Sequence, residues 1–168
     1  MATDGGGAEA SALLGRLDYQ RDHVLGIVSG LSDADLRRPV LPSGWSCLAM
    51  VNHLTYDVEW WWFTAIVGSE GADIDALGSD FDAWHVAADT PADEVIGRYR
   101  AEVERSNAVL QTHALDASLA YWPVHVWPDF RYDSFRDVVL HVLVETATHA
   151  GHLDAARELI DGRQWLVV

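Results

Sequence analysis

The chain has little cysteine, little positive charge and no long apolar run. Cys47 is the only cysteine among 168 residues, which excludes an intramolecular disulfide and a metal site built from thiolates alone. Lysine and arginine total 11 against 26 acidic residues, and the formal net charge is −15. This charge argues against binding to nucleic acid and to anionic membrane surfaces. No apolar stretch approaches the ~20 residues that a membrane-spanning helix needs.

The first residues, MATDGGGAEASALL, carry no basic region and no long apolar core, so they do not resemble a secretory signal. Together with the single cysteine, this predicts a cytoplasmic location. Apolar residues make up 49% of the chain, as in globular proteins. We expect a flexible segment over 1–10 and a single domain over 11–168, since this length suits one hydrophobic core.

The spacing of apolar residues predicts an all-α protein with four helices and no strand. Ser46, Thr90 and Ser134 are the expected N-caps of the last three helices, and Asp137 lies where it completes a capping box with Ser134. Gly162 fits a C-terminal stop. The simplest packing is an up-down four-helix bundle with two long connections, 69–89 and 114–132. The expected helices cover 11–29, 46–67, 91–113 and 134–160.

The last predicted helix carries a stripe of ionisable residues. His141, Glu145, His149 and His152 are spaced by four, four and three, which places them on one helical face. Glu145 and His149 can close on one ion, and His53, from an apolar stretch of the second predicted helix, is the candidate third ligand. Two histidines and one carboxylate with an open fourth position are typical of catalytic zinc. Ni²⁺, Fe²⁺ and Mn²⁺ also accept these donors. His141 is expected either on the open helix face or beside the ligands.

Other polar residues near the stripe are expected to support it. His152 could replace Glu145 as a ligand, orient a ligand, or move a proton. Asp57 could substitute as a ligand or accept a hydrogen bond from His53. Cys47 lies about 120° from His53 on a helical wheel, so it should not reach the same ion. Each of these residues alone also fits an ordinary core or surface position. Burying them together without a metal or full hydrogen bonding would cost several kcal/mol.

Eight tryptophans are available to line a substrate pocket. On an α-helical wheel Trp60 points with His53, whereas Trp62 points to the opposite side. Trp60, Tyr56 and Asp57 are therefore the candidate pocket residues, although Trp60 fits bundle packing equally well. Trp61 and Trp62 are expected to pack the bundle or an oligomer surface. Trp122 and Trp127 are expected to close one end of the bundle, with a lid as the alternative.

Three segments, PSGWSCLAMVNHL, EWWWF and ETATHAGHLDAARELIDG, resemble the DinB/YfiT-like metalloenzyme superfamily. The most similar branch is actinobacterial. It includes mycothiol-dependent S-transferases and the metal-binding domain of mycothiol-dependent maleylpyruvate isomerase. The resemblance covers about 13–162. It implies a four-helix bundle, often dimeric, with a divalent metal near one end held by His53, Glu145 and His149.

Thr148 stands where related sequences commonly carry arginine immediately before the last ligand histidine. If that arginine binds an anionic substrate or thiol, the remaining candidates on the predicted helices are Arg98, Arg100 and Arg157. Each of these could equally be ordinary surface charge. The chain also lacks the second domain of the isomerase, so the maleylpyruvate reaction itself is not expected.

The donor set and the resemblance together predict a transferase that uses a divalent metal, zinc first, to activate a low-molecular-weight thiol such as mycothiol. The thiol would attack an electrophilic small molecule. The rival hypotheses are a metal-dependent hydrolase that activates water and a non-enzymatic metal- or ligand-binding stress module. A structural homodimer with a histidine network is a third. Expected partners are the thiol, the electrophile and a second copy of the chain in a homodimer.

Overall fold

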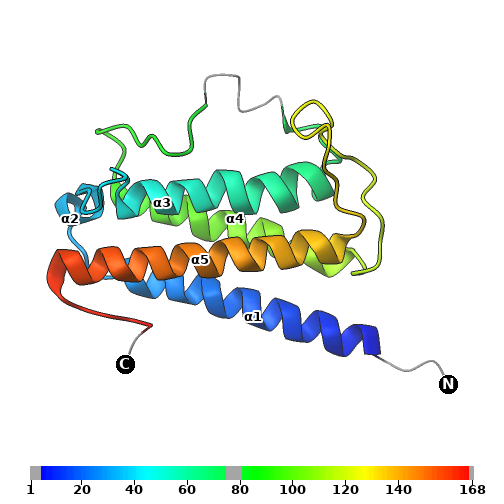
Figure 1. Ribbon diagram of the computed structural model, residues 1–168, viewed down its shortest axis with the longest axis horizontal. Coiled ribbons are helices and arrows are strands. Elements are labelled where there is room, and N and C mark those ends of the chain that lie inside the picture. Colours follow the sequence, from blue (N-terminus) through cyan, green and yellow to red (C-terminus); the bar gives the residue numbers. More distant parts are fainter. Residues whose placement is uncertain (1–4, 75–80, 167–168) are drawn as a thin grey trace.

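Four long helical segments pack into a bundle in the computed structural model, which describes residues 5–74 and 81–166 (Figure 1). The described residues contain no strand, so the all-α bundle expected from the sequence is confirmed. Within the same ranges, no helix is both long enough and apolar enough to cross a membrane. The long segments are α1 (Gly5–Val28), α3 (Cys47–His53) continued by η1 (Leu54–Gly68), α4 (Ala92–Thr112) and α5 (Phe135–Asp161).

Several helix ends carry the capping contacts that the sequence predicted. The Ser46 hydroxyl accepts a hydrogen bond from the backbone N–H of Ala49 at the start of α3. Ser134 and Asp137 form the predicted capping box of α5, which satisfies two backbone donors at once. Gly162 ends α5 with φ of 77°, a left-handed conformation that glycine adopts without steric cost.

Two segments are more ordered than the sequence predicted. α1 begins at Gly5, so the described part of the segment expected to be flexible, 1–10, is helical. A short helix, α2 (Asp33–Arg37), lies between α1 and α3. Ser32 caps it by accepting a hydrogen bond from the Asp35 N–H. The spacing of apolar residues did not predict this helix, because five residues are too few for a periodic pattern.

The start of α4 differs by one residue from the prediction. Pro91, not Thr90, is the capping residue, and its carbonyl accepts hydrogen bonds from the N–H groups of Glu94 and Val95. No side chain caps this end of the helix. The Thr90 carbonyl instead accepts a hydrogen bond from the guanidinium of Arg37, so tertiary contact with α2 holds Thr90 outside the helix.

α4 runs parallel to η1, and the helix directions therefore do not alternate strictly along the chain. The Thr64 hydroxyl donates to Glu102 at 2.5 Å, and Gly68 at the end of η1 lies against Val109 near the end of α4. The long connection 69–91 returns the chain to the beginning of α3 before α4 starts (Figure 1). A short loop would have forced an antiparallel neighbour, so the length of this connection decides the topology.

α1 and α5, side by side in Figure 1, are also parallel. Glu9 near the start of α1 pairs with Arg136 near the start of α5 at 2.8 Å. Near the other end, the Arg157 guanidinium donates to the carbonyls of Ile27 and Ser29. α5 lies antiparallel to α3 and η1, because His53 packs against His149 whereas Trp62, later along η1, packs against His141, earlier along α5. This relation assembles the site described below.

η1 is wound as a π-helix, in which hydrogen bonds join residues five apart, as in the bond from the Ser69 N–H to the Thr64 carbonyl. Such a helix has more residues per turn than the 3.6 of an α-helix. An α-helical wheel therefore assigns the wrong face to residues well beyond His53. In the structure Trp62, not Trp60, shares a hollow with His53, which corrects the expectation from the sequence.

A buried ion pair fixes η1 against α1. The Nε and Nη2 atoms of Arg21 donate to the two carboxylate oxygens of Glu59, each at 2.7 Å. The two side chains are only 3% and 1% exposed. Arg21 also donates to Asp18 and Asn107 at 2.8 Å, so its guanidinium has partners on three sides. Both charges are compensated inside the bundle, which is the condition for burying them.

The substitution Glu59→Gln should lower the free energy of unfolding by about 3 kcal/mol, because it leaves the buried guanidinium without its main counter-charge. Denaturant unfolding monitored by circular dichroism measures the change. The matched control is Glu94→Gln, which removes an exposed partner of Arg98 and should change the same quantity by less than about 1 kcal/mol. Equal losses in the two variants would contradict a structural role for the buried pair.

Candidate metal centre

Three possible metal ligands meet between α3 and α5. His53 is the last residue of α3, whereas Glu145 and His149 lie one turn apart on α5. Each offers one ligand atom that lies within 4.8 Å of the other two, and all three side chains are half-buried. The antiparallel packing of α5 on the α3–η1 segment brings the rings of His53 and His149 to 5.0 Å, edge to face. The structure thus places together the three residues that the sequence singled out.

The distances within this cluster suit a tetrahedral cation. Glu145 Oε2 lies 3.3 Å from His149 Nε2. Two ligands at about 2.0–2.2 Å from a tetrahedral zinc ion are separated by roughly 3.3–3.5 Å, so this pair is already at a chelating distance. Two imidazoles and one carboxylate are also a donor set that divalent zinc accepts. The residues present therefore fit a divalent cation.

Asp57 supports the first histidine of the cluster. Its Oδ2 atom lies 2.9 Å from His53 Nδ1, which leaves His53 Nε2 available for a metal. A carboxylate that accepts a hydrogen bond from the second ring nitrogen is the usual companion of a metal-binding histidine, because it selects the tautomer and holds the ring. Asp57 lies one turn beyond His53, within hydrogen-bond distance of its ring.

The pKa of His149 is lowered from its ordinary value. Burial is the main cause, since it disfavours the charged ring, and the neighbouring His53 acts in the same direction. Glu145 opposes the shift, because a carboxylate favours the imidazolium. The neutral imidazole is the form that binds a metal, so the environment of His149 favours metal binding at neutral pH.

His152 and His141 lie on opposite sides of the cluster. His152 is exposed, and its Nδ1 atom lies 3.4 Å from Nδ1 of His149, on the side of that ring away from Glu145. The His141 ring lies edge-on to Trp62, with centroids 4.5 Å apart, and burial lowers the pKa of His141. His152 can therefore contact solvent and a candidate ligand at once, whereas His141 faces the interior of a neighbouring hollow.

Trp84, which the sequence analysis did not identify, covers one face of the cluster. Its ring stacks on His53 with centroids 4.2 Å apart and an interplanar angle of 18°. The preceding residue, Ala83, is buried, and its carbonyl accepts a hydrogen bond from the buried Asn52 amide at 2.8 Å. The loop is thus anchored on the residue next to His53. The only sequence signal for this contact was the length of the 69–91 connection.

A hollow of roughly 290 Å³ opens beside Glu145. Its aromatic lining includes Trp62 and not the expected Trp60, which packs against Trp61. Tyr56 lies instead against Phe81, with ring centroids 4.8 Å apart. Of the three predicted pocket residues, only Asp57 lines this hollow. The full lining is His53, Asp57, Val58, Trp62, Trp127, Phe130, Tyr132, His141 and Glu145.

The tryptophans of the connection 113–134 divide between the core and this hollow. Trp122 is buried and packs against Trp62 and Trp127, as expected for a residue that closes one end of the bundle. Trp127 is half-buried, stacks on Trp62 and forms part of the hollow's wall. The connection therefore both closes the bundle and shapes the cavity.

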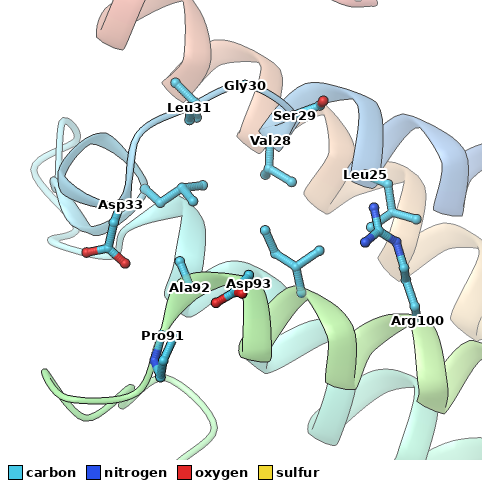
Figure 2. Close-up of a pocket in the computed structure, with 12 residues that line it drawn as sticks. Leu25, Val28, Ser29, Gly30, Leu31, Asp33, Pro91, Ala92, Asp93 and Arg100 are labelled. Atoms are coloured by element: carbon cyan, nitrogen blue, oxygen red, sulfur yellow. The ribbon is translucent and has the colours of Figure 1, made fainter.

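The arginines considered as replacements for the one missing before His149 lie elsewhere. Arg98 pairs with Glu94 on the surface. Arg157 is buried and binds backbone carbonyls at the end of α1 and the carboxylate of Asp161. Arg100 lines a different hollow, of roughly 480 Å³, between the end of α1 and the start of α4 (Figure 2). That larger hollow contains none of the three candidate ligands, so its size does not make it the site of the chemistry.

The fold and the donor set define the class of this protein as a helical bundle with a candidate metal centre between two antiparallel helices. The family model for mycothiol-S-transferase matches residues 12–162. The chain therefore belongs to the mycothiol-S-transferase family, a DinB/YfiT-like branch, and this family implies a transferase. Neither the comparison with curated proteins nor that with solved structures found a match.

The substitution Asp57→Asn should weaken zinc binding about 10- to 100-fold, because an amide orients the His53 ring less well and does not raise its basicity. Competition with a chromophoric chelator measures the affinity. Asp89→Asn, an exposed aspartate in the 69–91 connection, is the matched control and should bind zinc like the parent protein. Unchanged affinity in Asp57→Asn would exclude the supporting role.

An NMR titration of the metal-free protein should give His149 a pKa below 6.5, since burial favours its neutral form. The variant Glu145→Gln should lower this pKa further, because it removes the carboxylate that stabilises the imidazolium. The ring therefore becomes protonated, and zinc affinity declines, only at a pH below the pKa of an ordinary histidine. A midpoint above 6.5, or a rise in Glu145→Gln, would contradict this environment.

Proposed function

We propose that the protein is a metal-dependent transferase that joins a low-molecular-weight thiol to an electrophilic small molecule. The thiol is mycothiol, as membership of the family implies. The observation that carries the proposal is the cluster of His53, Glu145 and His149 at the edge of an aromatic-lined hollow. Zinc is the metal that the two nitrogens and one oxygen favour. The family match supports the thiol as cosubstrate.

The residues of the site have separate roles in this proposal. His53, Glu145 and His149 hold the metal, and Asp57 keeps the His53 ring oriented. A divalent metal, when bound, lowers the pKa of a thiol that it coordinates. The aromatic hollow positions the electrophile beside the cluster and excludes water from its reactive carbon.

The exposed position of His152, next to His149, suits it to accept the thiol proton and release it to solvent. The sulfur then supplies an electron pair to the electrophilic carbon. A carbon–sulfur bond forms, and the leaving group departs with the electron pair of the bond that breaks. This balance requires no redox partner.

The protein's own thiol does not suit the role of nucleophile. Cys47 is buried, and burial raises the pKa of its thiol to about 11. The thiolate is the nucleophilic form of cysteine, so Cys47 is unreactive at neutral pH. It also lies outside the cluster, as its position on the helical wheel predicted. A nucleophilic sulfur must therefore come from a second molecule, which is the reason for proposing a thiol cosubstrate.

Zinc-loaded protein should conjugate electrophiles from a panel only when mycothiol is present, and His53→Ala should lower kcat/KM at least about 100-fold through loss of the metal. Mass spectrometry of the conjugate and metal analysis are the readouts. His125→Ala, an exposed histidine of the 113–134 connection, is the matched control and should retain activity.

Two outcomes would overturn this proposal in favour of a rival. Turnover that needs zinc but no thiol would identify a hydrolase, in which water takes the place of the thiol. Stoichiometric zinc without thiol binding or turnover would identify a non-enzymatic module. A homodimer and a cytoplasmic location remain predictions from the sequence, which sedimentation and cell fractionation can test.

A further inference from the structure

The walls of the hollow beside Glu145 consist of flat aromatic rings. Trp62 and Trp127 are parallel within 8°, with centroids 5.1 Å apart. Phe130 lies edge-on to Tyr132, with centroids 4.7 Å apart. These rings come from η1 and from the 113–134 connection, so two distant parts of the chain build one wall. Because Trp62 and Trp127 stack on each other, a flat apolar ligand can pack against the remaining faces and edges of these rings and gain both burial and favourable ring geometry.

The polar part of the same lining carries no fixed positive charge. Its carboxylates are Asp57 and Glu145, and no arginine or lysine belongs to the described lining. A carboxylate or phosphate on the ligand would therefore meet like charges and find no guanidinium to pair with. If Glu145 holds a metal, an anionic ligand would compete with the thiol for the open metal position. Both arguments favour a ligand without charge.

The size and the exposure of the hollow limit the size of the ligand and its direction of entry. The volume of roughly 290 Å³ lies just below the range of about 300–1,000 Å³ that small-molecule sites span. Phe130 is 48% exposed, so it lies at the solvent end of the wall, whereas Trp62 is 5% exposed and forms the inner end. A molecule of one or two rings can enter past Phe130 and reach the buried end.

We propose that the electrophile half of the reaction is an uncharged, planar aromatic molecule of one or two rings, bound against Trp62, Trp127 and Phe130. That the bound molecule is an electrophile rests on the proposed function, but its binding to the aromatic wall does not require turnover. It assigns substrate selection to a wall that is separate from the ligands of the metal. It also assigns Asp57 a second effect, the exclusion of acidic substrates.

Isothermal titration calorimetry on the metal-free protein, in which the acid cannot bind through a metal, tests the proposal with a matched pair of unreactive probes. The probes are 1,3-dinitrobenzene and 3,5-dinitrobenzoate, which share a ring and differ by one carboxylate. The uncharged probe should bind at least about tenfold more tightly than the acid. The variants Trp127→Ala and Phe130→Ala should each weaken its binding about five- to tenfold.

Trp165→Ala, a tryptophan with 51% exposure far along the chain from the hollow, is the matched control and should bind the uncharged probe like the parent protein. Circular dichroism confirms that each variant is folded, and Phe130→Ala serves as the second test because its side chain is the more exposed. Equal or tighter binding of the acid would overturn the proposal. So would unchanged binding in both wall variants.

The same measurements separate this inference from the proposed function. If dinitrobenzene binds to the wall but no thiol is ever transferred, the proposed function fails and the aromatic site stands. If thiol transfer occurs and neither Trp127→Ala nor Phe130→Ala alters the KM for an aromatic electrophile, the transferase stands and the aromatic site fails.

Discussion

The candidate metal centre depends on the antiparallel packing of α5 along the α3–η1 segment. At one level of this interface His53 meets His149, and further along it Trp62 meets His141. Because the two helices run in opposite directions, the ligands and the aromatic wall fall in order along a single interface. Shifting α5 by one turn, about 5.4 Å, would move His149 away from His53, although Glu145 and His149 would stay together on α5.

The winding of η1 decides which of its side chains face this interface. Trp62 faces α5, while Glu59, three residues earlier, faces α1 and is held there by Arg21. A rotation of η1 that moved Trp62 would also withdraw a buried carboxylate from its only guanidinium partner among the described contacts, which costs several kcal/mol. The ion pair on one side of η1 thus stabilises the orientation of the site on the other side.

The two long connections complete the site from outside the bundle. One presents Trp84 on the face of His53 and is anchored through Ala83, and the other contributes Trp127 and Phe130 to the aromatic wall. Long connections are often functional, since a rigid scaffold can carry variable loops. In this protein the helices supply the candidate metal ligands and six of the nine residues that line the hollow, and the 113–134 connection supplies the other three.

Features that depend on local spacing could be predicted from the sequence. The capping box at Ser134, the stop at Gly162 and the shared helical face of Glu145 and His149 follow from neighbours on one regular helix, and His53 was recognisable as an ionisable residue in an apolar stretch. The direction of α4, the winding of η1, and the positions of Trp62 and Trp84 could not be predicted in this way. These depend on how distant segments pack, and a wheel of 3.6 residues per turn could not follow a helix that is wound differently.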